Sequence, residues 1–374
     1  MKITSVRAVP LGSPLAEPLR WGAMEVGIKG GIVVLVDTDE GVTGIGEAGF
    51  SAEYFPTVGP IINEQLAPML IGQNPTMIAE LWQQMLEATH MWGRRGVETY
   101  AISGIDIALW DLLGKLSEQP TYRLLGAAKT RVRCYFAPSL KPTPQIVAEA
   151  ARAVEDGYSA IKLRATSDLA ESVELVAAVI DKVGSALEVM VDANMSYDRR
   201  GALALARELE ALGVYWLEEP IRAHSLTQYI DDHTWLAERV SLRLAGGESM
   251  LTRFEYIDLL RRHTFDVLQP DCTSVGGISE AKRVADLAST WNIQCVPHIA
   301  CSSGTGIALA AGLHLILACS NAPLVEVDAY GGPGWEGLLT DPLMVSQGFL
   351  DAPEKPGLGV ELAKNALRRF GLHR

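Results

Sequence analysis

Several features are scarce in this sequence of 374 residues, and each scarcity argues against a class of protein. Positive charge is in deficit, because 32 lysine and arginine residues stand against 45 aspartate and glutamate residues, which gives a net charge of -13. No broad basic surface is therefore expected, and nucleic acid is an improbable partner. Long hydrophobic runs are also missing: stretches such as residues 307–318 are too short to span a bilayer, so no membrane partner is expected.

The cysteines give no indication of disulfide bonds. The five cysteines are odd in number and scattered through the chain, which disfavours a disulfide framework and fits a reducing compartment. The first residues, MKITSVRAVP, contain no apolar core of a signal peptide. We therefore predict a cytoplasmic location. Because 48% of the residues are hydrophobic, the chain is long and apolar enough to bury a large core.

The pattern of apolar and polar residues divides the chain into two parts. Residues 1–48 alternate apolar and polar positions around hairpin turns, and residues 60–125 carry apolar residues at helical spacing. The sequence thus predicts an α+β domain over residues 1–128. From residue 129 to 345 the chain repeats a short β-branched run, a loop and an amphipathic helix, eight times. This alternation predicts a closed parallel (β/α)8 barrel.

Ionisable residues lie near the ends of the second to eighth apolar runs. The steps between them are 30, 26, 30, 23, 27 and 28 residues, each the length of one strand and helix. Because the carboxyl ends of barrel strands meet at one face, all seven are expected at one mouth. They are Lys162, Asp192, Glu218, Glu248, Asp271, His298 and Glu326.

Three carboxylates come from successive strands, at Asp192, Glu218 and Glu248. Gathered together they would repel one another, so they call for a cation. Oxygen-only ligands favour Mg²⁺, and zinc is disfavoured because His298 is the only histidine in phase. Glu219 alternates with Glu218 along the strand and is expected to support the site from behind.

Asp271 and His298 end the next two runs, so adjacent strands should bring them within hydrogen-bonding reach. A carboxylate bonded to one imidazole nitrogen fixes the tautomer and raises the basicity of the other nitrogen. His298 is therefore the candidate general acid or base.

The motifs KLR, VDAN, WLEEP, AGGES, LQPD and VPH, in this order after the helix SGIDIALWDLLGK, resemble the enolase superfamily and its mandelate racemase branch. The resemblance spans nearly the whole chain. It implies a capping domain whose loops close over a barrel, three Mg²⁺ ligands at the carboxylates named above, and abstraction of the proton α to the carboxylate of a small-molecule substrate. It also implies a homo-oligomer. Residues 346–374 are expected to return to the capping domain.

Arg164 departs from the lysine that this branch commonly carries as a second base. Deprotonating an arginine near pH 7.5 costs roughly 7 kcal/mol, so Arg164 should not abstract a proton. We assign Lys162 and Arg164 to stabilising the carboxylate and the enediolate, and proton abstraction to His298, with Lys162 as the alternative base. The dianionic enediolate explains why two cations are aimed at one place.

One base that can also act as acid favours dehydration of an acid sugar to a 2-keto-3-deoxy acid. A lactone cycloisomerase is the nearest alternative, a racemase or epimerase the next, and a barrel that binds a metal without turnover the most remote. Glu326 matches a position where the branch places a protonated carboxyl that donates to the substrate. Asn194 is a further candidate contact in the site.

Substrate specificity should come from the capping loops, about residues 16–28 and 48–56, with Trp21 and Arg95 as candidate substrate contacts. The amides after Ser302 and Ser303, at the start of the last long helix, are candidates to hold a substrate carboxylate. The glycines of GIGEAG match the fingerprint of a dinucleotide-binding site. No helix follows them, however, and Glu47 would face the pyrophosphate, so we interpret this stretch as the end of a hairpin.

Overall fold

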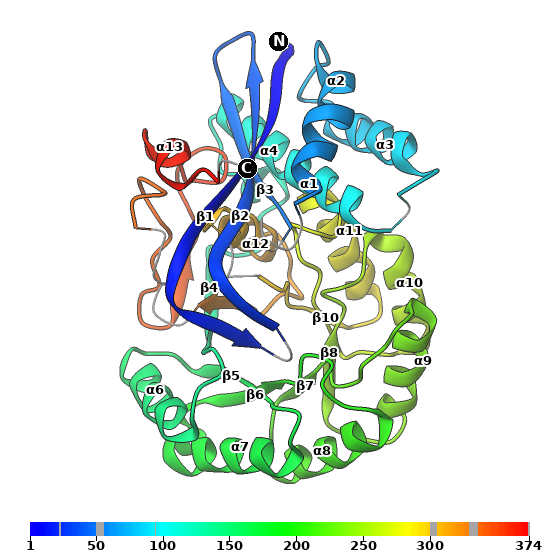
Figure 1. Ribbon diagram of the computed structural model, residues 1–374, viewed down its shortest axis with the longest axis vertical. Coiled ribbons are helices and arrows are strands. Elements are labelled where there is room, and N and C mark those ends of the chain that lie inside the picture. Colours follow the sequence, from blue (N-terminus) through cyan, green and yellow to red (C-terminus); the bar gives the residue numbers. More distant parts are fainter. Residues whose placement is uncertain (22–23, 50–55, 94, 300–304, 329–335, 373–374) are drawn as a thin grey trace.

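The computed structural model describes residues 1–21, 24–49, 56–93, 95–299, 305–328 and 336–372. Two parts are evident in Figure 1: the blue strands and cyan helices of a capping domain at one end, and a barrel with α6 to α8 at the opposite end. Within the described residues no helix is both long enough and apolar enough to cross a membrane.

The capping domain is an antiparallel sheet with helices, as predicted. Its sheet has the order β1 (Ile3–Trp21), β2 (Met24–Thr38) and β3 (Thr43–Ala48). Its helical elements are α1 (Val58–Pro60), the π-helix η1 (Ile61–Leu66), α2 (Ala67–Leu70), α3 (Ile78–Thr89), α4 (Val97–Leu116) and α5 (Thr121–Leu124).

The glycines of the GIGEAG stretch serve the packing of β3 on α4. A Cβ atom on Gly44 would lie 2.1 Å from the carbonyl oxygen of Ala108, and one on Gly46 would lie 2.1 Å from that of Gly104. Only glycine therefore lets the strand backbone approach the helix backbone so closely. This agrees with the interpretation as a hairpin strand.

The predicted parallel barrel is confirmed. Its strands are β4 (Arg131–Ala137), β5 (Ala160–Arg164), β6 (Glu188–Asp192), β7 (Trp216–Glu218), β8 (Arg243–Gly246), β9 (Val267–Leu268), β10 (Gln294–Cys295) and β11 (Leu324–Asp328). They pair in parallel in the order β10-β9-β8-β7-β6-β5-β4-β11, so β11 returns to the first strand. Between β10 and β11, the amide of Cys295 donates to the carbonyl of Asn321 at 3.0 Å.

Helices alternate with the strands and cover the barrel. They are α6 (Thr143–Glu155), α7 (Leu169–Val183) with the short 3₁₀ turn η2 (Gly184–Ala186), α8 (Arg199–Ala211), α9 (Leu226–Ala237), α10 (Thr252–Arg262), α11 (Gly277–Thr290) and α12 (Ile307–Leu317). Side-chain caps start several of them: Asp168, Asp198 and Ser225 accept from the amides of Glu171, Gly201 and Gln228.

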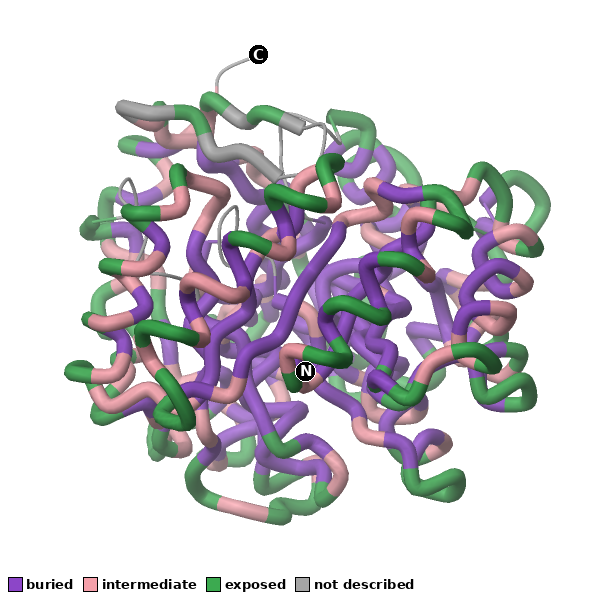
Figure 2. Tube along the Cα trace, turned by 90° about the horizontal axis from the view of Figure 1, so that it is seen from below, coloured by how far each residue is buried: buried purple, intermediate pink, exposed green. Residues whose placement is uncertain are grey.

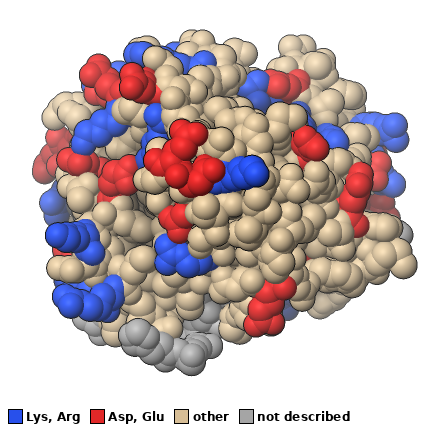
Figure 3. All heavy atoms as spheres, turned by 90° about the horizontal axis from the view of Figure 1, so that it is seen from above, with Lys and Arg blue, Asp and Glu red and all other residues tan. Residues whose placement is uncertain are grey.

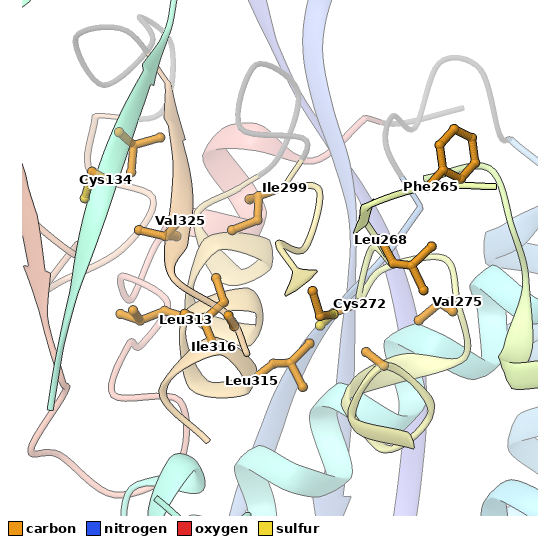
Figure 4. Close-up of a cluster of buried hydrophobic side chains, with 14 of the residues drawn as sticks. Cys134, Phe265, Leu268, Cys272, Val275, Ile299, Leu313, Leu315, Ile316 and Val325 are labelled. Atoms are coloured by element: carbon orange, nitrogen blue, oxygen red, sulfur yellow. The ribbon is translucent and has the colours of Figure 1, made fainter. Parts of the chain in front are cut away.

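Burial follows this layering. Figure 2 shows buried residues along the central strands and exposed residues on the outer turns of the helices. Figure 4 shows one part of the core, where Leu313 and Ile316 of α12 lie on the side of Val325 of β11, and Leu315 points toward Cys272. Four of the five cysteines are buried free thiols, and the fifth, Cys301, lies outside the described residues. On the face seen in Figure 3, acidic and basic side chains are interspersed.

The last segment contacts both parts of the molecule. β12 (Phe349–Asp351) pairs antiparallel with β4, and α13 (Ala366–Phe370) is followed by a bridge between Gly371 and Leu11 of the capping sheet. The amide of Leu358 donates to Asp111 Oδ1 of α4 at 2.7 Å. The domain boundaries at residues 128 and 345 stay predictions.

Candidate active site

Four side chains of the candidate site stand at the C-terminal ends of adjacent strands β5, β6 and β7. Arg164, Asp192 and Glu218 are the last residues of these strands, and Lys162 lies two residues before Arg164. Arg164 pairs in register with Asp192, and Asp192 pairs with Glu218. Strand pairing alone therefore brings two cations beside two carboxylates, as the spacing in the sequence predicts.

Lys162 is the centre of a buried charge cluster. Its side chain is fully buried, with Nζ at 2.8 Å from Glu218 Oε1, 3.2 Å from Glu326 Oε1 and 3.8 Å from Asp192 Oδ2. Burial lowers the pKa of Lys162, but the three carboxylates outweigh burial and raise the pKa above its usual value. Lys162 is therefore held as a cation in this structure, and its role as an alternative base stays a prediction.

Arg164 is tied to the carboxylate of the neighbouring strand. Its Nη1 lies 2.5 Å from Asp192 Oδ2 and donates to Asn194 Oδ1 at 3.1 Å. Burial lowers the pKa of Arg164, and Asp192 with the other carboxylates more than offsets this, so the net shift is upward. Asn194 in turn donates from its amide nitrogen and from Nδ2 to Asp192, at 2.8 and 3.1 Å. Asn194 thus orients Asp192 in this structure, and its contact with substrate stays a prediction.

Glu218 is fixed through both oxygens. While Oε1 faces Lys162, Oε2 accepts from Gln269 Nε2 at 2.8 Å and from Trp216 Nε1 at 3.3 Å. Burial raises the pKa of Glu218 to about 7, with Asp192 acting in the same direction and Lys162 opposing it. Gln269 was not predicted from the sequence; it stands two residues before Asp271, and the alternation of side chains along a strand was the available signal.

Glu219 turns away from this cluster, as the alternation predicts. It has a left-handed backbone, with φ of 37°, and its Oε1 accepts from Tyr229 Oη at 2.6 Å and from the amide of Gly247 at 3.0 Å. Burial raises the pKa of Glu219 to about 8, and the nearby Glu248 adds to the shift. Glu219 therefore supports the residue that precedes Glu248 rather than facing Lys162.

His298 lies between two carboxylates. Nδ1 is 2.8 Å from Asp271 Oδ2, and Nε2 is 3.1 Å from Glu248 Oε2. Burial lowers the pKa of His298, but Glu248 and the hydrogen bond to Asp271 outweigh it and raise the pKa to about 10. Asp271 is itself held, because Oδ1 accepts from the amide and the hydroxyl of Thr273 at 2.7 and 2.6 Å. The predicted proximity of Asp271 and His298 is thus observed.

The donors predicted for a metal are oxygen atoms of Asp192, Glu218 and Glu248, a set that suits Mg²⁺. Burial raises the pKa of Glu248 as well as that of Glu218, so a cation beside them would favour their ionised forms. Within the described residues no three acidic, histidine or cysteine side chains are arranged to hold a metal; Asp192 and Glu218 pair with Arg164 and Lys162. The donor chemistry fits, and the ligand assignment stays a prediction.

Glu326 lies in the cluster but not in the predicted protonation state. Burial would raise the pKa of Glu326, yet Lys162, His298 and Arg164 outweigh it and lower the pKa to about 2. Glu326 also accepts from the amide of Ile299 at 3.3 Å. It is therefore an ionised acceptor here, because the nearby cations stabilise the charge, and its role as a protonated donor to the substrate stays a prediction.

Two residues are expected at the mouth of the site. Arg95 donates to the carbonyl of Ser249 at 2.9 Å and pairs with Glu255 of α10 at 2.9 Å, so it binds this part of the barrel, and its contact with substrate stays a prediction. The side chain of Trp21 lies outside the described part of the chain.

The start of α12 is also occupied. The amides of Thr305 and Ala308 donate to Glu47 of β3 at 3.0 and 2.9 Å, and the Thr305 hydroxyl donates to Glu47 at 2.8 Å. These two amides are therefore not available to a substrate carboxylate, because an internal carboxylate caps the helix. Ser302 and Ser303 lie outside the described residues.

The sequence matches two protein families along most of its length. Residues 3–126 match the mandelate racemase / muconate lactonizing enzyme N-terminal domain, and residues 145–366 match the enolase C-terminal domain-like family. An arabinonate dehydratase of Saccharolobus solfataricus is 32% identical, covering 90% of this chain and 89% of the relative. A D-galactarolactone cycloisomerase of Agrobacterium fabrum is 30% identical over 99% of both chains.

A solved structure of similar fold contains a metal. It is a racemase from Streptomyces coelicolor A3(2) with bound magnesium, with a TM-score of 0.87 and 27% identity, covering 99% of this chain and 100% of that one.

Proposed function

Because the chain belongs to the mandelate racemase / muconate lactonizing enzyme family of the enolase superfamily, and is thus an enzyme acting on a small molecule, we propose that it dehydrates an acid sugar to a 2-keto-3-deoxy acid. The observation that carries this proposal is the asymmetry of the site. His298 is an imidazole hydrogen-bonded to Asp271 and can exchange a proton, whereas the guanidinium of Arg164 stays charged and Lys162 is assigned to stabilising negative charge. One acid/base group suits elimination better than racemisation.

In the proposed reaction, His298 Nε2 removes the proton from the α-carbon while Nδ1–H stays bonded to Asp271. The electron pair of the broken C–H bond forms the enediolate, whose charge Lys162 and Arg164 offset. His298 then returns its proton to the β-hydroxyl group, the C–O bond breaks, water leaves, and the enol tautomerises to the ketone. Base and acid act on one face, so the elimination is syn.

The protonation of His298 depends on Glu248. In this structure the Glu248 carboxylate, 3.1 Å from Nε2, keeps the imidazole charged. Any interaction that neutralises Glu248 lowers the pKa of His298 toward its usual range and frees Nε2 to accept a proton. Mg²⁺, held by Asp192, Glu218 and Glu248, would supply positive charge beside the substrate carboxylate.

A sugar-acid lactone cycloisomerase is the second candidate. The Agrobacterium fabrum relative that covers 99% of this chain has this type of activity, and the same histidine could deliver a proton during ring opening or closure. A racemase or epimerase needs a base on each face of the α-carbon, which the arginine at position 164 disfavours. The remote alternative is a barrel that binds ligand and metal without turnover.

Proton NMR separates these candidates. The protein is incubated in D₂O with Mg²⁺ and, one at a time, with pentonates, hexonates, hexarates and their lactones. A 2-keto-3-deoxy product supports dehydration, and interconversion of lactones without a keto product supports the cycloisomerase. Inversion at the α-carbon without elimination would mean that a second base exists. Activity should vanish with a chelator and return with Mg²⁺, whereas a binding protein would give no product under any condition.

We further propose that the enzyme acts in the cytoplasm as a homo-oligomer without nucleic acid or membrane partners. The buried free thiols of the described cysteines fit a reducing compartment, and the net charge of -13 disfavours nucleic acid. Light scattering coupled to size-exclusion chromatography would test the assembly: a mass of 40.4 kDa would identify a monomer and contradict that part of the proposal.

A further inference from the structure

The loop of residues 271–277, between β9 and α11, carries Asp271 at its start and contacts the capping domain at its end. Trp82 Nε1 of α3 donates to the carbonyl of Gly276 at 2.8 Å. The amide of the same Gly276 donates to Ser103 Oγ of α4 at 2.8 Å. Trp82 is 1% exposed and Ser103 is fully buried, so both hydrogen bonds are shielded from water.

The same two domains are joined again one turn into α11. The amide of Ser279 donates to Asp106 Oδ2 at 3.0 Å, and Trp110 Nε1 donates to Ser279 Oγ at 2.8 Å. Asp106 thereby accepts from an amide at the start of α11, where a carboxylate is favoured. Gly277 has φ of 87°, and a Cβ atom there would lie 2.2 Å from Asp106 Oδ2, so the close approach requires glycine.

Inside the loop, short hydrogen bonds connect this clamped end to Asp271. The amide of Val275 donates to the carbonyl of Asp271 at 2.8 Å, and Thr273 donates twice to Asp271 Oδ1. The capping domain adds one more contact, because the amide of Gly49 donates to the carbonyl of Thr273 at 2.9 Å. Asp271 Oδ2 is left facing His298 Nδ1. The loop is therefore a compact, internally bonded turn, and a displacement of one end moves the other.

From this geometry we propose that Trp82, Ser103, Asp106 and Trp110 are positioning residues for the acid/base pair. They hold the loop of residues 271–277 in place and so keep the Asp271 carboxylate aligned with His298. The capping domain thus contributes to the protonation chemistry, in addition to any contact with substrate. The proposal rests on the proposed function, because it takes His298 as the group that exchanges the proton.

Two variants remove single hydrogen bonds to Gly276: Trp82→Phe keeps an aromatic ring, and Ser103→Ala removes only the hydroxyl. Both should lower kcat by about tenfold or more and leave KM within about twofold, since small misplacements of an acid/base group are costly to the chemical step. Thr89→Val is the matched control, because the buried Thr89 hydroxyl donates only within α3.

A readout independent of turnover is the low-field NMR resonance of the His298 Nδ1 proton, measured with ¹⁵N-histidine. It should move upfield in Trp82→Phe and Ser103→Ala and stay in place in Thr89→Val. If the resonance and kcat both stay unchanged while the melting temperature falls as in the control, the four residues are merely structural and the proposal is wrong. An increase of KM alone would also overturn it.

The two proposals fail in different ways. A wild-type protein that converts no acid sugar would contradict the proposed function. The imidazole resonance would still test whether Trp82 and Ser103 hold Asp271 against His298. Should Ser103→Ala not fold, Trp82→Phe gives the decision, because it keeps an aromatic ring at this buried position and removes only the indole N–H donor.

Discussion

The replacement of a basic lysine by Arg164 leads to a quantitative prediction about proton exchange. At pH 7.5 an arginine of pKa about 12.5 is deprotonated at a cost of roughly 7 kcal/mol, and a lysine of pKa about 10.4 at roughly 4 kcal/mol. The 2.5 Å contact with Asp192 raises the pKa of Arg164 further, so the arginine figure is a lower limit. Changing arginine to lysine at this position should therefore ease the formation of a base by about 3 kcal/mol, or on the order of a hundredfold.

The test uses exchange of the substrate α-proton with D₂O, followed by NMR. His298→Asn should reduce exchange by about a thousandfold or more, because no competent base remains. Adding Arg164→Lys to that variant should restore exchange by up to a hundredfold, while Arg164→Met in the same background should not. Exchange in His298→Asn within tenfold of the wild type would refute the reasoning, since Lys162 or Arg164 would then be abstracting the proton.

Three further predictions concern other parts of the molecule. Gln269→Leu should weaken Mg²⁺ binding 10- to 100-fold by calorimetry, because Glu218 loses the donor that orients it, and an unchanged affinity would contradict this role. Gly46→Ala should lower the free energy of unfolding by about 3 kcal/mol in urea, whereas Gly27→Ala, where a Cβ meets nothing within 4 Å, should cost far less; equal effects would argue against the packing explanation. Burial raises the pKa of Glu47 to about 7, so protonation of Glu47 stabilises the fold below pH 4.5, and this stabilisation is lost as pH rises through 7. Glu47→Gln should therefore reduce the change in the free energy of unfolding between pH 4 and 9 by about 3 kcal/mol. Plots of that free energy against pH that run parallel for the wild type and the variant would refute this prediction.

The barrel and its cluster of charges were predictable because both follow from local patterns. A strand of the barrel is a short apolar run, and a polar residue at the carboxyl end of that run lies at the mouth of the barrel. The end of each run can be located in the sequence even where its start is uncertain. Lys162, Arg164, Asp192 and Glu218 are read from such run ends, and strand pairing alone brings them together.

What the sequence did not reveal depends on contacts between distant segments. Glu47 stands 258 residues before Thr305, and no periodicity connects a hairpin residue to the start of a late helix. The ionised state of Glu326 depends on Lys162 at 3.2 Å, a distance that spacing along the chain does not contain. The contacts of Arg95 with Ser249 and with Glu255 of α10 likewise join segments more than 150 residues apart, which no spacing in the sequence indicates.

The return of the last segment to the capping sheet has a consequence for the order in which the chain folds. Asp111 of α4 is bonded to Leu358, 247 residues later, and Leu11 pairs with Gly371. During synthesis the strands β1 to β3 leave the ribosome before the barrel, and Leu358 and Gly371 leave it after the barrel. The capping domain therefore lacks these contacts while the barrel forms, and loss of residues 358–371 would leave its sheet and α4 without them.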